Sequence, residues 1–163
     1  DEFIMSKETN YIKQLRKRIE LTSSDDSITN ESKLKSKYDF NVPNTNLVVK
    51  REIIHLTSLE EDIFYFVEQF RETVLLTCWD NQTSLSVLSS IISDNLRKQI
   101  MHIKDCETAL EQLLRLKYTK ELAFYYNDLL GEVTQEKFFT IKKYKDIIIN
   151  IIQRLAICCS LGK

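Results

Sequence analysis

The sequence predicts an all-α protein, an elongated antiparallel helical bundle with one or two long, coiled-coil-like helices. The 163 residues include only two glycines and one proline, the residues that provide positive φ angles and turns. A β-sandwich or barrel needs a turn about every 8 to 12 residues and is therefore disfavoured. In several stretches apolar residues recur at steps of three and four, which places them on one face of a helix. The chain is also long enough to bury a core without disulfides or metal.

The N-terminal part divides into a helix and a linker. Ile12, Leu15 and Ile19 recur at helical spacing between basic residues, which predicts a short amphipathic helix over residues 1–21. Residues 22–46 are rich in Ser, Thr, Asp, Asn and Lys, and they contain the single proline. Such a composition favours a flexible linker or loop. The helical bundle domain is therefore expected to occupy residues 47–163.

The bundle domain opens on a short segment, residues 47–54, that fits a helix and an extended segment equally well. A helix is predicted to begin at Ser58, because Ser58 and Glu61 form a capping-box pair. Its apolar face consists of Leu59, Ile63, Phe66, Val67, Phe70, Val74 and Cys78. Thr83 or Ser84 is expected to cap the next helix.

Residues 85–130 form the longest uninterrupted helical pattern. They contain neither glycine nor proline, and their apolar residues keep helical spacing with one change of phase near residues 104–107. As a single helix, this stretch would extend roughly 70 Å at 1.5 Å per residue, as in an elongated bundle or coiled coil. A break at residues 93–95 or at Asp105 would instead give a compact bundle. The pattern does not choose between the two arrangements.

The last helix is expected to follow a tight connection. Gly131 is placed as a C-terminal cap and Thr134 as the next N-terminal cap, so the neighbouring helices should be antiparallel. Beyond them, a seam at steps of three and four, interrupted by Lys145, consists of Phe138, Ile141, Ile148, Ile152, Leu155 and Cys159. Further isoleucines on other sides, at positions 147, 149 and 151, predict a central helix that is buried on more than one side.

Charge and hydropathy argue against several classes of function. The 23 Lys and Arg residues nearly balance the 24 Asp and Glu residues, and the net charge of -1 provides no field to attract nucleic acid. The longest apolar run, residues 147–152, already contains Asn150, whereas a membrane span needs about 20 apolar residues. Basic clusters such as residues 13–18 and 142–145 could contact anionic lipid headgroups. The net charge gives no support to binding at a membrane surface.

The cysteines indicate a reducing compartment. Cys78, Cys106, Cys158 and Cys159 lie in apolar helical stretches and not in the loop positions of a disulfide framework. We therefore expect an intracellular protein, cytoplasmic or nuclear. His102 and Cys106 have a spacing by which two side chains can share zinc, and Cys158 with Cys159 could complete four ligands. Adjacent cysteines rarely ligate one zinc ion and the chain has no CxxC pair, so no metal site is predicted.

No catalytic site is predicted either. General acid–base or nucleophilic catalysis needs a nucleophile with a base, or paired carboxylates, and the only histidines are His55 and His102. The acidic run Glu60–Asp62 lies in the expected first turn of a helix, where acids complement the helix dipole. Phosphate-binding loops require several suitably spaced glycines, which the chain lacks. We expect a protein that is not an enzyme and holds no cofactor.

Wide apolar helix faces without a reactive site predict protein–protein interaction. Phe124, Tyr125 and Tyr126 span most of the circumference of a helix, so one small core cannot easily cover all three. The residues predicted to bind a partner are Tyr118, Leu122, Phe124, Tyr125, Tyr126, Leu129, Ile147 and Ile151. The sequence thus predicts an intracellular scaffold or interaction module that binds another protein or a second copy of itself as a dimer.

Two alternatives remain open. The long stretch 85–130 and the scattered lysines are broadly similar in architecture to BAR-type domains, a similarity that implies a helical dimer on membrane surfaces in intracellular trafficking. The triplets Asn30–Ser32 and Asn81–Thr83 match the acceptor pattern for N-glycosylation. They would suit a secreted, four-helix cytokine-like ligand.

Overall fold

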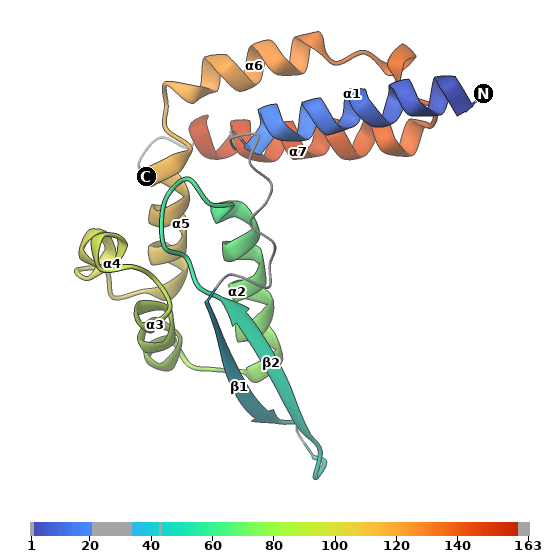
Figure 1. Ribbon diagram of the computed structural model, residues 1–163. Helices are drawn as coiled ribbons and strands as arrows, with labels where there is room; N and C mark the ends of the chain where they lie inside the picture. The colour runs from blue at the N-terminus through green and yellow to red at the C-terminus, as the bar shows by residue number, and fades with distance from the viewer. Residues whose placement is uncertain (1, 21–33, 43, 160–163) are drawn as a thin grey trace. The chain divides into compact units, whose positions relative to one another are not determined.

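The computed structural model describes residues 2–20, 34–42 and 44–159 (Figure 1). The helices in these ranges are α1 (Glu2–Glu20), α2 (Ile63–Thr77), α3 (Asn81–Ser90), α4 (Asp94–Ile100), α5 (Cys106–Lys117), α6 (Leu122–Glu132), α7 (Ile141–Cys159) and a 3-10 helix (Gln135–Lys137). The strands are β1 (Lys35–Asn41) and β2 (Val48–Ile54). The prediction of a mostly helical chain is confirmed, but the prediction that it is all-α is wrong.

The two strands form an antiparallel hairpin in which Lys35 pairs with Ile54 and Asn41 with Val48. The connecting turn is closed by a hydrogen bond of 3.0 Å from Val42 N to Leu47 O. Asn44 lies in this turn at a φ of 65°, a left-handed conformation that asparagine adopts more readily than most residues.

The hairpin corrects part of the predicted linker. Residues 34–42 of the predicted linker 22–46 are mostly strand β1, and the undecided segment 47–54 is mostly strand β2. Residues 21–33 and 43 lie outside the described residues, so the structure does not address that part of the linker.

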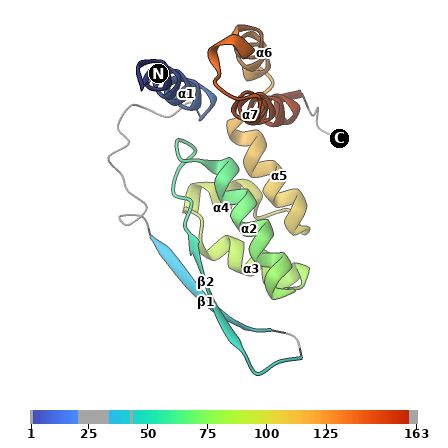
Figure 2. The same ribbon diagram turned by 90° about the vertical axis from the view of Figure 1, so that its right-hand side faces the viewer.

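The chain divides into two compact units. Unit 1 consists of Asp1–Ser24 with Tyr118–Lys163, and unit 2 consists of Asp25–Lys117. The predicted N-terminal helix is present as α1, and it belongs with α6 and α7 in unit 1. Within that unit α7 packs against both α6 and α1 (Figure 2).

Unit 2 has a core between α2, α5 and β2. The buried face of α2 includes Ile63, Phe66, Val67 and Phe70, as the apolar spacing predicted. The rings of Phe66 and Phe70 stack with centroids 6.4 Å apart. To the same core α5 contributes the buried Ala109, Leu110, Leu113 and Leu114, and β2 contributes the buried Ile53.

The starts of α2 and α3 differ from the predicted positions. Asp62, not Ser58, caps α2, because its carboxylate accepts a hydrogen bond of 2.9 Å from Tyr65 N. Ser58 instead accepts a bond from Glu60 N in the preceding turn. At α3 the cap is Asp80, and its bonds from Thr83 lower the pKa of the Asp80 carboxyl. In both cases an aspartate outcompetes the hydroxyl residue predicted as the cap.

The stretch 85–130 is not one long helix. It runs through the end of α3, all of α4 and α5 and most of α6, so the unbroken alternative is wrong, and the predicted coiled-coil character is not confirmed. Both break positions considered from the sequence are observed: Ser93 precedes α4, and Asp105 accepts a bond of 3.0 Å from Thr108 N at the start of α5. The architectural similarity to BAR-type domains was based on this long helix and on scattered lysines, and it loses the first of these two grounds.

The connection before α7 also differs from the predicted one. Gly131 lies inside α6 instead of beyond its end, and Thr134 precedes the 3-10 helix instead of α7. The last helix begins at Ile141, and Thr140 Oγ1 accepts a hydrogen bond of 3.2 Å from Lys143 N. That bond satisfies one of the backbone donors left free at a helix start.

Candidate functional site

Unit 1 has a small core to which all three of its long helices contribute. The buried apolar and aromatic side chains of these helices include Leu15 and Ile19 of α1, Tyr126 and Leu129 of α6, and Ile147, Ile151 and Cys158 of α7. The Tyr126 hydroxyl donates a hydrogen bond to Ile19 O, and burial raises the pKa of Tyr126 well above its ordinary value. The neighbouring Tyr125 hydroxyl donates to Arg18 O at 2.8 Å. These bonds join α6 to α1 with both aromatic residues.

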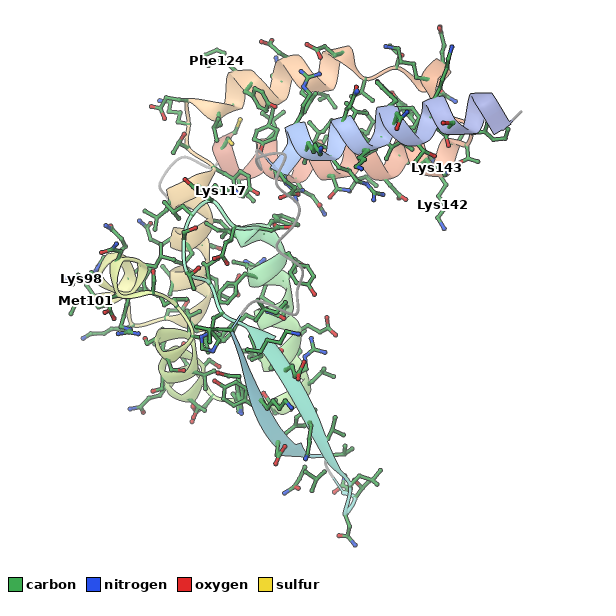
Figure 3. The ribbon with its side chains drawn as sticks, viewed as in Figure 1. Lys98, Met101, Lys117, Phe124, Lys142 and Lys143 are labelled. Carbon is green, nitrogen blue, oxygen red and sulfur yellow. The ribbon has the colours of Figure 1, made fainter. Side chains whose placement is uncertain are left out.

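The eight residues predicted to bind a partner do not form one surface. Five of them are buried, namely Tyr118, Tyr126, Leu129, Ile147 and Ile151. Leu122 and Tyr125 are half-buried. Phe124 is 79% exposed and points outward from α6 (Figure 3). The predicted surface therefore narrows to Phe124 and its half-buried neighbours, and any larger partner surface has to be sought on other residues.

A buried ion pair fixes the rotation of α7 against α1. Arg154 is only 2% exposed, and its guanidinium forms a salt bridge with the Glu20 carboxylate. The same guanidinium donates to Asn150 O at 3.0 Å and to Asn150 Oδ1 at 3.2 Å. A buried charge is tolerated only when it is paired and hydrogen-bonded, so the side of α7 that carries Arg154 has to face α1.

A second ion pair holds the other end of α7. The Glu8 carboxylate accepts a hydrogen bond of 2.7 Å from Lys143 Nζ and another from Phe139 N. The bond from Lys143 holds the pKa of the Glu8 carboxyl below its usual value. Because Glu8 and Glu20 bind α7 near its two ends, the face that α7 turns away from the core is fixed as well.

That outward face carries a row of side chains, all but one of them apolar, which we name the α7 outer strip. The strip consists of Ile141, Lys145, Ile148, Ile149, Ile152, Leu155 and Cys159. Ile141 is 57%, Ile149 50% and Ile152 46% exposed. Ile148 and Leu155 are half-buried, and Cys159 is exposed. Full burial of one isoleucine side chain of the strip would contribute about 1.5–3 kcal/mol of stabilising free energy relative to full exposure.

The strip corrects the predicted orientation of the last helix. The seam predicted from the sequence lies largely on this strip, whereas the buried face is formed by Ile147, Ile151, Arg154 and Cys158. The two faces have the same three-and-four spacing, one position apart. Periodicity alone could not distinguish them, because the inward face includes an arginine that its partner on α1 neutralises.

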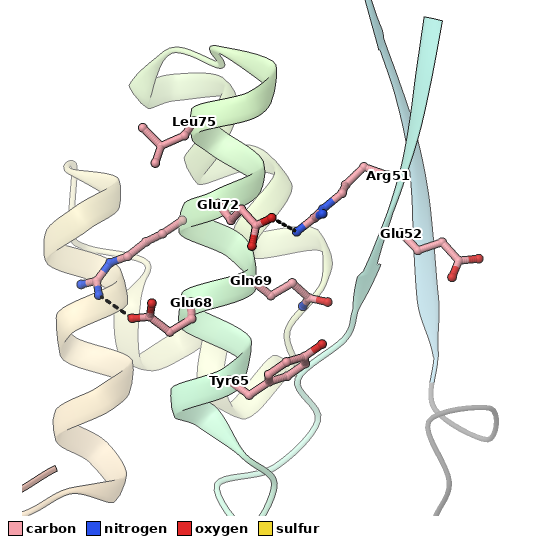
Figure 4. Close-up of a pocket in the computed structure, with 8 residues that line it drawn as sticks. Arg51, Glu52, Tyr65, Glu68, Gln69, Glu72 and Leu75 are labelled. Carbon is pink, nitrogen blue, oxygen red and sulfur yellow. Dashed lines mark hydrogen bonds and ion pairs between the residues drawn. The ribbon is translucent and has the colours of Figure 1, made fainter. Parts of the chain in front are cut away.

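Unit 2 has a polar pocket between β2 and α2, with a volume of about 560 Å³ (Figure 4). Arg51 and Glu72 form a salt bridge of 3.4 Å across it. Gln69 accepts a hydrogen bond of 3.3 Å from Ile54 N and so joins the helix to the strand. The pocket also contains Glu52 and Glu68, and its cationic and anionic groups largely pair with one another, which gives little selectivity for a charged ligand.

A second groove of unit 2, between α2, α3 and α5, is more apolar. Its volume is about 460 Å³, and its lining includes Val74, Leu75, Trp79, Cys106 and Leu110. Leu75 is 78% exposed. The apolar side chains of this groove do not recur at the regular spacing of the α7 outer strip. They therefore do not define the shape of a partner.

The histidines and cysteines considered for metal binding or catalysis are spread over both units. Among the described residues, no group of three His, Cys, Asp or Glu side chains is placed to hold a metal ion. Cys106 is buried, and desolvation raises the pKa of its thiol to about 11, whereas His102 is exposed. His55 Nε2 lies 2.6 Å from Ser36 Oγ across the hairpin, and neither residue lines either of the two pockets.

Comparisons do not add a family or a function. Scans of the chain against protein-family models, curated proteins and solved structures gave no significant match. In the part of the chain that the structure describes, no helix combines the length and apolarity needed to cross a bilayer.

Proposed function

We propose that this chain is a non-enzymatic protein-interaction module that self-associates through the α7 outer strip. The observation that carries the proposal is the row of isoleucines on a helix held at both ends by Glu8 and Glu20: Ile141, Ile149 and Ile152 are about half exposed, and Ile141, Ile148 and Ile152 have heptad-like spacing. Apolar residues repeated every 3.5 residues on average are the pattern by which two helices pack along a seam. Water contact along such a row is unfavourable, so a second helix covering it would stabilise the protein.

A second copy of the chain fits this surface better than an unrelated partner does. The strip has only one charged residue, Lys145, so it offers little electrostatic selectivity for a different protein. A helix with apolar residues at positions a and d of each heptad can pack against an identical helix, because each side chain then fits between those of its counterpart. Self-pairing uses the same surface twice, as most closed homodimers do.

Sedimentation velocity on the unaltered chain tests the proposal. Over a roughly hundredfold range of concentration, the average mass is expected to rise from that of the monomer toward that of the dimer, because association follows mass action. The monomer has a mass of 19.3 kDa and the dimer twice that mass, so the change in average mass is readily measured. A chain that remains monomeric over the whole range would contradict the proposal.

A further inference from the structure

The spacing of the α7 outer strip defines a specific pairing of two copies. This inference rests on the self-association proposed above. Ile141, Ile148 and Leu155 lie seven residues apart, and Lys145, Ile152 and Cys159 form a second set at the same interval. The two sets alternate along α7 in steps of four and three, as the d and a positions of successive heptads do.

In an antiparallel pair of helices, the a positions of one helix pack against the d positions of the other. If Ile148 of one copy lies opposite Ile152 of the second copy, the remaining members of the two sets also lie opposite one another. Lys145 then lies opposite Leu155, and Ile141 opposite Cys159. The pairing uses the full length of α7, since no member of either set is left without a counterpart.

The charges on α7 favour the antiparallel direction. In a parallel pair in the same register, Lys145 would meet Lys145 of the second copy within the seam, and like charges so close repel each other. In the antiparallel pair the two Lys145 side chains lie apart. The aliphatic part of each Lys145 side chain would then lie along Leu155 of the other copy. Its ammonium group would be directed toward the C-terminal part of the other helix.

The C-terminus of α7 is suited to receive that lysine. The last turn of α7 contains no basic residue, so its free carbonyl groups have no cationic side chain from the same turn beside them. A helix C-terminus carries a partial negative charge that a lysine from another helix can stabilise. On these grounds, we propose that two copies of the chain pair through antiparallel α7 helices, with Ile148 of each copy against Ile152 of the other.

The native cysteine at the end of the strip reports the direction of pairing. In a parallel dimer the two Cys159 side chains would meet, and mild oxidation would join them. In the antiparallel dimer they lie at opposite ends of the interface, roughly 27 Å apart at 1.5 Å per residue, and a disulfide requires Cα atoms within about 7 Å. The background for the experiment is Cys78→Ser, which removes the exposed cysteine of unit 2.

The decisive variant is Ile141→Cys in this background. The antiparallel register places position 141 against Cys159 of the second copy, so oxidation should yield at least about tenfold more covalent dimer than the background gives. Peptide mass mapping should locate a disulfide between positions 141 and 159. Two controls, Ile141→Cys with Cys159→Ser and Asp146→Cys with Cys159 intact, should remain at the background level. Ile141 and Asp146 are both exposed, so their replacement should leave the fold unchanged.

The possible results separate the inference from the function on which it rests. A dimer by sedimentation that crosslinks through Cys159 to Cys159 would overturn the antiparallel direction. A dimer by sedimentation in which Ile141→Cys gives no added crosslink would overturn the register. In both cases self-association would stand. A monomer by sedimentation would instead contradict the proposed function itself.

Discussion

Replacing Ile149 and Ile152 together by aspartate is expected to raise the dissociation constant of the dimer by at least about 100-fold. The change removes two apolar side chains from each copy and places one charge within the seam, at position 152, and one beside it, at position 149, and burial of an unpaired charge is strongly unfavourable. A factor of 100 in the dissociation constant corresponds to about 2.7 kcal/mol of binding free energy. Full burial of Ile149 and Ile152 in both copies could contribute more than this. Sedimentation velocity of the variant beside the unaltered chain measures the effect.

Two matched controls test whether the effect belongs to this surface. Leu75→Asp and Met101→Asp each place one aspartate on unit 2, at side chains that are 78% and 73% exposed. Both controls should dimerise like the unaltered chain. If a control dissociates while the Ile149 and Ile152 variant remains dimeric, the interface lies on unit 2 instead. Circular dichroism should show unchanged helix content in all three variants, because none of the replaced side chains is buried.

The second large effect is expected at the buried ion pair of unit 1. Arg154→Met should lower the free energy of unfolding by about 3–5 kcal/mol, the usual cost of removing one partner from a buried pair. The variant leaves the Glu20 carboxylate without the guanidinium that forms a salt bridge with it. Urea unfolding followed by circular dichroism measures the loss.

The cost should be largely reversed by a second substitution. Arg154→Met combined with Glu20→Leu removes both charges, and apolar replacement of a whole buried pair is often neutral or stabilising. Recovery of most of the lost stability would show that the penalty comes from the uncompensated carboxylate. A loss below about 1 kcal/mol for Arg154→Met alone would show that the pair does not fix α7 as described.

The local apolar patterns predicted the helices better than their ends. The spacing of Ile63, Phe66, Val67 and Phe70 correctly predicted the buried face of α2. The hairpin was missed because β1, with the sequence KSKYDFN, is as polar as a linker and packs only one of its sides. Its strand structure depends on pairing with β2, which is a non-local interaction that composition does not reveal.

The breaks in the stretch 85–130 also depend on distant residues. No glycine or proline marks the end of α3. There the backbone of Leu56 accepts a bond of 3.0 Å from Ser93 N and donates one of 2.9 Å to Ile91 O. Arg97 then donates to Ser89 O at 2.8 Å. These bonds replace helical ones between α3 and α4, and a periodic apolar pattern contains no sign of them.

The sequence predicted that α7 has more apolar side chains than one buried face needs. It did not predict which face is buried. Two faces of this helix have nearly the same spacing, and the inward one includes Arg154, which a sequence pattern assigns to solvent. Only the pairing with Glu20, which lies 134 residues away in the chain, places that arginine inside. Phe124, Tyr125 and Tyr126 were predicted not to be covered all together by one small core, and Phe124 is 79% exposed.

The most direct measurement is the concentration dependence of isoleucine methyl resonances in the unaltered chain. Self-association through the α7 outer strip predicts that the methyl signals of Ile141, Ile148, Ile149 and Ile152 shift or broaden as the concentration rises, because these side chains lose their contact with water. The buried Ile53 and Ile63 of unit 2 should stay constant. Shifts confined to unit 2, or none in the strip at concentrations where the chain is dimeric, would contradict the account.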